Sequence, residues 1–407
     1  MGRKILWFVS FIMAILLVML SLPMDIGSEA IAAVASHSKR DIGINVMGAE
    51  NKNQRFMSDS AYTFEYPDAV RGIYVTGHSA GSSRFHSLVE LVGSTDLNTM
   101  VIDVKDDHGN LTFQVPPDSP YADIAKNYID DPKGMMKTLE EKNIYPIARI
   151  VVFKDSVLAQ KRPDLSFKEN GEIWRNGNGE AFVNPFLREV WEYNVGIAKM
   201  AAKTGFKEIQ FDYVRFPEGF EKMDNELDYS MGDYKDINMN NIKKRVEAVT
   251  NFVGYAKDEL MSYGVDVSVD IFGYAATMEE TPGIGQNFSR ISSQVDVISS
   301  MIYPSHWSEN YFGIRLPDTE PYRLISSYAK VENEVLEALE NPPTSRPWIQ
   351  DFEAPWLYTG QTKEYGKKEV EAQIKALYEN GINEFLLWNA ANNYTKNVDY
   401  LVGKNKT

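Results

Sequence analysis

Short apolar runs alternate with amphipathic segments from about residue 70 to the end of the chain. This alternation is typical of βα units, in which buried parallel strands are apolar throughout and the intervening helices are apolar on one face. Eight of the apolar runs are predicted strands: Gly72–Thr76, Met100–Val104, Pro146–Val152, Glu208–Tyr213, Val265–Phe272, Val297–Tyr303, Pro347–Phe352 and Glu384–Trp388.

Helices are predicted between these strands. The clearest is Asn241–Tyr263, where apolar residues recur at spacings of three and four. Gly205 and Gly381 stand just past predicted helix ends, where glycine is favoured. The other predicted helices are Phe85–Val92, Pro132–Lys142, Leu187–Lys203, Tyr322–Leu339, Lys367–Glu379 and a closing Thr395–Val402.

Eight strands, each followed by a helix, predict an α/β fold of the (β/α)₈ TIM-barrel type. An open doubly wound sheet is the alternative. No Gly-rich nucleotide-binding motif follows any predicted strand, so nucleotide binding is not supported. The long segments 153–185 and 216–240 are predicted to be loops at the active site.

The N-terminus carries the marks of an export signal. Arg3 and Lys4 precede an apolar run, Ile5–Leu20, and two A-x-A sites end at Ala32 and Ala35. We therefore predict a signal peptide over 1–35, a polar arm over 36–69, and the barrel over 70–407. The alternative is an uncleaved membrane anchor, the only membrane contact expected. In both cases we expect a bacterial protein whose barrel is secreted or held at the cell surface.

Composition narrows the chemistry. The 407 residues carry a formal net charge of −15, with no Cys and five His. Lack of Cys excludes disulfides, thiol catalysis and Cys-bound zinc, and the negative charge argues against nucleic acid as a partner. We expect no metal and no cofactor. One metal alternative stays open, in which the clustered Asp103, Asp106, Asp107 and His108 bind a hard cation.

In a barrel, catalytic residues come from the C-terminal ends of strands. Carboxylates stand at four such ends, and a buried charge is costly unless it is paired. Arg215 follows Asp212 closely and is the expected partner of that carboxylate. The polar and aromatic residues near the strand ends are Asp103, Lys105, Asp212, Arg215, Asp270, Tyr303, His306, Trp307, Asp351 and Trp388.

Converging carboxylates and aromatic rings point toward sugar chemistry. Glycosidases use one carboxylic acid to protonate the leaving oxygen and one carboxylate as nucleophile or base. Sugar rings also stack on flat apolar side chains. Trp174, Trp307, Trp356 and Trp388 lie in or beside loops that follow strands, whereas Trp191 and Trp348 are expected in the core.

A competing motif is Gly77-His78-Ser79-Ala80-Gly81, which matches the G-x-S-x-G nucleophile elbow of serine hydrolases. It lies between a predicted strand and helix, as that motif requires. However, it follows the first strong strand, no H-G-G-G-type oxyanion loop precedes it, and the triad His would have to be His306. The other interpretation is a small-residue loop that lets substrate or backbone approach closely.

The stretches RGIYVTGHSAG, MVIDVKDDHG, EIQFDYVRFP, VSVDIFGY and SSMIYPSHW carry a resemblance. With them, the chain from about Val70 to Val402 resembles the putative glycosyl hydrolase domain family of exported bacterial proteins, placed among the α-amylase-like barrel glycosidases. The resemblance implies a TIM barrel and glycoside hydrolase activity. In the wider clan the nucleophile ends strand 4, the acid/base follows strand 5 and a further Asp ends strand 7, which are the places of Asp212, Asp270 and Asp351.

Two features depart from that clan. Its acid is usually Glu, whereas the strand-5 residue here is Asp270. Its strand-4 Arg sits two residues before the nucleophile, whereas Arg215 sits three after Asp212.

The expected function is hydrolysis of a bacterial or environmental polysaccharide with retention, with Asp212 as nucleophile and Asp270 as acid/base. The residues expected to bind the sugar are Asp103, Lys105, Arg215, Tyr303, His306 and Asp351, with Trp307 and Trp388 stacking on it. The alternative is a catalytically silent carbohydrate-binding barrel and, less favoured, a serine hydrolase that uses Ser79.

Overall fold

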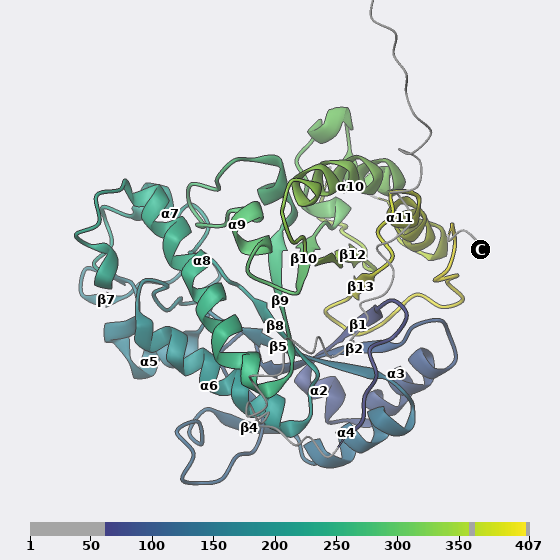
Figure 1. Ribbon diagram of the computed structural model, residues 1–407, viewed down its shortest axis with the longest axis horizontal. Coiled ribbons are helices and arrows are strands. Elements are labelled where there is room, and N and C mark those ends of the chain that lie inside the picture. Colours follow the sequence, from purple (N-terminus) through teal and green to yellow (C-terminus); the bar gives the residue numbers. More distant parts are fainter. Residues whose placement is uncertain (1–61, 358–362, 404–407) are drawn as a thin grey trace, which may run out of the picture. The chain divides into compact units, whose positions relative to one another are not determined.

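Eight parallel strands close into a barrel in the computed structural model, which describes residues 62–357 and 363–403 (Figure 1). The ring is closed because β1 pairs with both β13 and β2. This confirms the TIM barrel and excludes the open sheet. In chain order the barrel strands are β1 (Arg71–Val75), β2 (Thr99–Lys105), β5 (Tyr145–Val151), β8 (Glu208–Asp212), β9 (Asp266–Phe272), β10 (Val297–Met301), β12 (Trp348–Gln350) and β13 (Phe385–Trp388).

Helices surround the strands in Figure 1, each covering an apolar outer face of the barrel. The predicted helices are present except the last. They are α3 (Ser83–Gly93), α4 (Pro132–Glu141), α6 (Arg188–Thr204), α8 (Asn241–Leu260), α10 (Pro321–Glu337) and α11 (Lys367–Glu379), with a short α9 (Phe288–Ser292) that was not predicted.

The prediction of a closing helix over Thr395–Val402 is wrong, since residues 395–403 form turns and irregular structure. Backbone donors here bind side chains instead of a helical carbonyl. The N–H of Thr395 donates to Asp351 and the N–H of Asp399 donates to Glu371. Such side-chain partners compete with helix formation.

Side chains along each strand point alternately toward the surrounding helices and into the barrel, which gives two apolar layers. On β1, Ile73 packs outward against the helices, whereas Tyr74 points into the barrel. Val101 and Ile147 likewise fill the barrel interior. The N-terminal end of the barrel is closed by a buried ion cluster in which Arg346 binds Glu208 and Glu384. The interior is therefore packed at one end, and open space lies at the other.

Shorter elements sit in the loops that follow the strands. The two segments predicted as long loops contain short structure of their own: α5, β6 and β7 follow β5, and α7 follows β8. The bounds of the shorter elements are α2 (Gly77–Ala80), β3 (Leu111–Phe113), β4 (Ala125–Ile129), α5 (Ser156–Lys161), β6 (Lys168–Glu169), β7 (Glu172–Ile173), α7 (Phe220–Met223) and β11 (Thr344–Ser345).

The predicted signal peptide (1–35) and most of the predicted arm (36–69) lie outside the described residues. The end of the arm packs on the barrel, where the Tyr66 hydroxyl donates to Glu384 and the Thr63 N–H donates to Glu140. Within 62–357 and 363–403, no helix is both long and apolar enough to cross a membrane.

Candidate active site

A cavity of about 280 Å³ opens at the C-terminal ends of the barrel strands, where a TIM barrel carries its chemistry. Both proposed catalytic carboxylates, Asp212 and Asp270, line it. The remaining lining residues are Arg149, Tyr213, Arg215, Glu218, Phe272, Met301, Tyr303, His306, Trp348 and Trp388.

Asp212 is the last residue of β8, and Arg149 of the neighbouring β5 holds its carboxylate. The Arg149 Nε and Nη2 donate to Asp212 Oδ2 at 3.0 and 2.6 Å. The other oxygen, Oδ1, accepts the N–H of Tyr213 at 2.6 Å. Arg149 is fully buried and Asp212 is nearly so, and this charge-assisted pair fixes the position of the carboxylate.

The prediction that Arg215 pairs with Asp212 is therefore wrong. Tyr213 adopts a left-handed backbone conformation (φ 52°), which turns the chain directly after Asp212. Arg215 instead donates to Glu218 Oε1 and to the carbonyl of Phe216, both at 3.2 Å.

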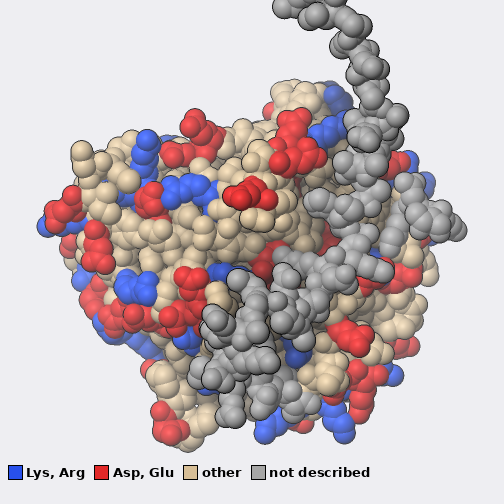
Figure 2. Space-filling model, viewed as in Figure 1, with Lys and Arg blue, Asp and Glu red and all other residues tan. Residues whose placement is uncertain are grey.

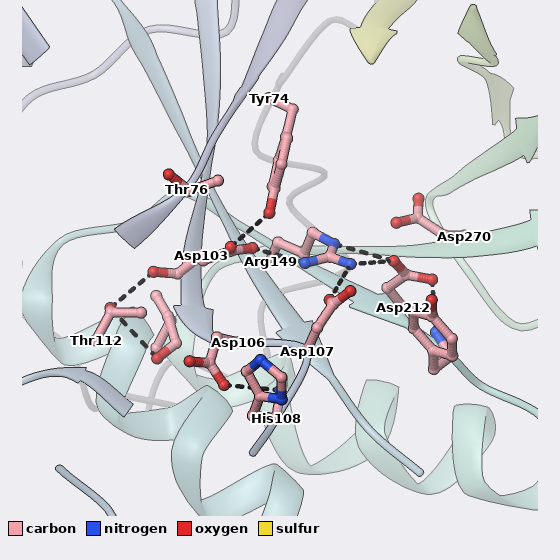
Figure 3. Close-up of polar contacts among 12 residues, drawn as sticks. Tyr74, Thr76, Asp103, Asp106, Asp107, His108, Thr112, Arg149, Asp212 and Asp270 are labelled. Carbon is pink, nitrogen blue, oxygen red and sulfur yellow. Dashed lines mark hydrogen bonds and ion pairs between the residues drawn. The ribbon is translucent and has the colours of Figure 1, made fainter. Parts of the chain in front are cut away.

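Arg149 gathers two further carboxylates. Figure 3 shows its guanidinium among Asp103 (2.7 Å), Asp107 (2.8 Å) and Asp212. Asp103 also accepts the Tyr74 hydroxyl at 2.6 Å and does not line the cavity. The structure thus places Asp103 behind Arg149, where it braces the guanidinium and does not line the cavity.

The two bracing carboxylates differ in environment. Burial raises the pKa of Asp103 to about 6, even though Arg149 and the Tyr74 hydroxyl act in the opposite direction. Burial also acts to raise the pKa of Asp107, but Arg149 and Lys154 outweigh it and lower that pKa to about 2. Asp107 is therefore ionised at neutral pH, at the solvent-facing edge of these ion pairs.

Sequence reasoning missed Arg149. The signal was available, because an Arg within the apolar run PIARIVV is as costly to bury unpaired as an Asp in a strand. Its partners, however, come from other strands and could not be read from the run itself.

Asp270 lies beside Asp212 on the adjoining strand. Phe211 of β8 pairs with Val269 of the parallel strand β9, so the residues that follow them, Asp212 and Asp270, are neighbours. Trp348 Nε1 donates to Asp270 Oδ1 at 2.8 Å. Burial raises the pKa of Asp270 well above its usual range, and the charge of Asp212 raises it further.

Trp348 was expected in the core, and it is nearly fully buried, but it has a second role. It lines the cavity floor and orients the Asp270 carboxyl through its N–H. A buried indole N–H needs a hydrogen-bond partner. The expectation that Trp348 is buried could therefore have indicated a contact with a polar strand residue such as Asp270.

Four more of the predicted residues line the same cavity: Arg215, Tyr303, His306 and Trp388. Trp388 stacks on Tyr74 with ring centroids 4.1 Å apart. Burial lowers the pKa of His306, so its imidazole is neutral near pH 7, with Nδ1 bound to the Ser305 hydroxyl at 3.0 Å.

Lys105 is not brought to the cavity. The pairing of β2 with β5 shifts register between Asp103 and Lys105, a bulge that reverses the expected side-chain direction. Lys105 is fully buried outside the barrel lumen, where its Nζ lies 2.6 Å from Asp155 and 2.9 Å from Asn194.

Trp307 and Asp351 also lie away from the cavity lining. The Trp307 ring packs against Tyr311 and Tyr328, on the helix side of the barrel wall. The Asp351 carboxylate accepts the Thr395 N–H and hydroxyl at 3.0 and 2.5 Å, so it anchors the last loop.

Neither competing site is assembled. Among the described residues, no hydrogen bond joins the Ser79 hydroxyl to an imidazole, and the His78 ring packs on Tyr128. In the Asp103–His108 cluster, Asp106 accepts the N–H groups of His108 and Gly109 and so closes a turn, while Asp103 and Asp107 face Arg149.

Comparisons with known proteins identify a family and a fold. A family model described as "Putative glycosyl hydrolase domain" matches residues 72–394. Curated proteins gave no match. A hypothetical protein from Ruminiclostridium thermocellum ATCC 27405 is 33% identical over 49% of this chain and 96% of its own, with a TM-score of 0.42.

Two solved glycosidase structures show the same fold. The PgaB (BpsB) glycoside hydrolase domain from Bordetella bronchiseptica has a TM-score of 0.57 and 13% identity, covering 83% of this chain and 100% of its own. The β-galactosidase of the psychrophilic Marinomonas ef1 has a TM-score of 0.52 and 12% identity, covering 79% of this chain and 54% of its own.

Proposed function

This chain belongs to the family described as "Putative glycosyl hydrolase domain", and we propose that it is an exported glycoside hydrolase that cleaves a bacterial or environmental polysaccharide with retention. Asp212 is the nucleophile and Asp270 is the acid/base. We also propose that the barrel belongs to the α-amylase-like group, because Asp212 ends its fourth strand and Asp270 lies near the end of its fifth.

One observation carries the proposal: two neighbouring carboxyl groups line one cavity in different surroundings. Asp212 accepts two hydrogen bonds from Arg149, whereas burial raises the pKa of Asp270 and the charge of Asp212 raises it further. Divergent environments for paired carboxyls are the mark of an acid and a nucleophile.

The proposed catalytic steps use Asp270 as the acid and Asp212 as the nucleophile. Asp270 gives its proton to the glycosidic oxygen as the bond to the anomeric carbon breaks, and Asp212 attacks that carbon to form a glycosyl-enzyme ester. Asp270, now ionised, takes a proton from water, whose oxygen displaces Asp212. Neighbouring strand backbones lie about 4.8 Å apart, and side-by-side positions favour the short carboxyl separation of retaining enzymes, about 5–5.5 Å.

The purified protein tests the proposal when it is incubated with cell-wall and exopolysaccharide preparations and new reducing ends are counted. Release by the wild type but not by Asp212→Asn supports hydrolysis at this site. Binding of a polysaccharide without release from any preparation would favour the silent carbohydrate-binding barrel.

We expect Ser79→Ala to leave the rate of reducing-end release within a few-fold of wild type, because no hydrogen bond joins the Ser79 hydroxyl to an imidazole in the part of the chain that the structure describes. A fluorophosphonate probe should also leave the protein unlabelled. A loss on the order of 10⁴, the scale for removing a covalent nucleophile, would assign the reaction to Ser79 instead.

Export rests on the order of basic, apolar and A-x-A segments in residues 1–35. We expect N-terminal sequencing of the protein from its native host to begin near Ala33 or Ser36. Recovery in membranes with Met1 intact would establish the anchor form.

A further inference from the structure

Arg215 is a second buried cation in the wall of the cavity, and its surroundings differ from those of Arg149. It is 6% exposed. Its guanidinium lies over the rings of Phe272 (4.7 Å) and Tyr213 (4.9 Å), which restrict its rotation. A planar, fixed guanidinium is a preorganised fork for an oxyanion.

Most of the hydrogen-bonding capacity of Arg215 is unused. A guanidinium has five N–H donors. One contacts the Phe216 carbonyl and one contacts Glu218, which leaves three without a partner among the described residues. Arg149, in contrast, uses Nε, Nη1 and Nη2 on three carboxylates. No Arg215 atom is among the buried polar atoms that lack a partner in the described residues, and Arg215 lines the cavity, so its free N–H groups are available to the oxygens of a ligand.

The single carboxylate on Arg215 is replaceable. Glu218 lies three residues along the chain, its side chain is 69% exposed, and the contact is 3.2 Å long. Because the Glu218 end of this ion pair is exposed, solvent screens it and its contribution is small. Glu218 can therefore leave for solvent when another anion binds, whereas Asp103 and Asp212, the buried partners of Arg149, cannot.

We propose that the cavity selects an acidic sugar, whose carboxylate or phosphate binds the free donors of Arg215 and displaces Glu218. The proposal rests on the proposed function, because it names the substrate class of the same cavity. An Arg fork binds both carboxylate and phosphate oxygens in a bidentate manner, so the shared chemistry is an anionic oxygen group on the ring.

The net charge of −15 does not oppose this at physiological salt. On the face seen in Figure 2, acidic and basic side chains are interspersed around the described surface. Charges farther away than about 8 Å are largely screened at 0.15 M salt. The local pair of Arg215 and its displaced Glu218 then decides the selectivity.

The test compares three sugars that differ only at C6, namely D-glucose, sodium D-glucuronate and D-glucose 6-phosphate. Their affinities for the full protein are measured by calorimetric or NMR titration at pH 7 and 0.15 M salt. We expect at least one anionic sugar to bind about tenfold or more tightly than glucose. Tighter binding of glucuronate identifies a uronate, and tighter binding of the phosphate identifies a phosphosugar.

Two variants make the result specific. Arg215→Gln should remove the preference for the anion, and Glu218→Gln, at an exposed position that does not threaten folding, should strengthen binding of the anionic sugar several-fold. Equal affinity for all three sugars, or weaker anion binding by Glu218→Gln, would overturn the proposal. Asp212→Asn should still bind the anionic sugar. Anion-selective binding by a wild type that releases no reducing ends from any polysaccharide would refute the proposed function and leave this inference standing.

Discussion

Asp212→Asn is expected to lower the rate of glycoside hydrolysis by a factor on the order of 10⁴ or more, the scale of losing a covalent nucleophile. The amide keeps the shape of the carboxylate but cannot attack the anomeric carbon. Initial rates of reducing-end release from a cleaved polysaccharide measure the effect. Full turnover by this variant would refute the mechanism.

The variant should remain folded. Arg149 keeps Asp103 and Asp107 as partners, and Asn can still accept one of its N–H groups. The change in the free energy of unfolding should therefore stay within about 1–3 kcal/mol. Denaturant unfolding of both proteins checks this.

Asp103→Asn is the matched control. It also removes one carboxylate from Arg149, but Asp103 does not line the cavity. Loosening the guanidinium misplaces Asp212 slightly, which can cost up to about 10² in rate. If Asp103→Asn lost as much activity as Asp212→Asn, the effect would belong to the ion network and not to a nucleophile.

Asp270→Asn is expected to slow hydrolysis of a polysaccharide by about 10²–10⁴-fold, the usual contribution of a general acid. The loss should be much smaller for an aryl glycoside with a nitrophenolate leaving group, which departs without a proton. An equal loss on both substrates would show that Asp270 does not protonate the leaving group.

The pH profile provides a second signature of Asp270. Burial raises its pKa, and the reaction needs the protonated acid, so wild-type activity should fall as pH rises through that pKa. Asp270→Asn should lose this basic limb. Trp348→Phe removes the hydrogen bond that favours the ionised form, so its basic limb should move to higher pH.

The same raised pKa affects stability. Because Asp270 binds its proton more tightly in the folded chain than in the unfolded chain, the wild type loses stability as pH rises above about 4 and through the folded pKa. Asn carries no charge and escapes this cost. Asp270→Asn should therefore be at least as stable as the wild type at pH 7, which thermal unfolding can establish.

The sequence by itself determined the barrel fold and the end of the barrel at which the candidate catalytic residues lie. Each of the eight apolar runs became a barrel strand, because a strand buried on both faces must be apolar along its length. Asp212 and Asp270 could be placed at one mouth because parallel strands all end on the same side. These features depend on local pattern and on chain direction, both of which the sequence carries.

The tertiary structure decided the pairing of side chains. Asp212 binds Arg149 and not the nearby Arg215, because a left-handed Tyr213 turns the chain between them. A bulge in β2 removes Lys105 from the cavity, and Trp348 reaches Asp270 from a strand 78 residues away. Closure of the barrel brings strands that are distant in the sequence next to one another. A buried charge then pairs with the opposite charge or polar group that lies nearest in space, whatever its distance along the chain.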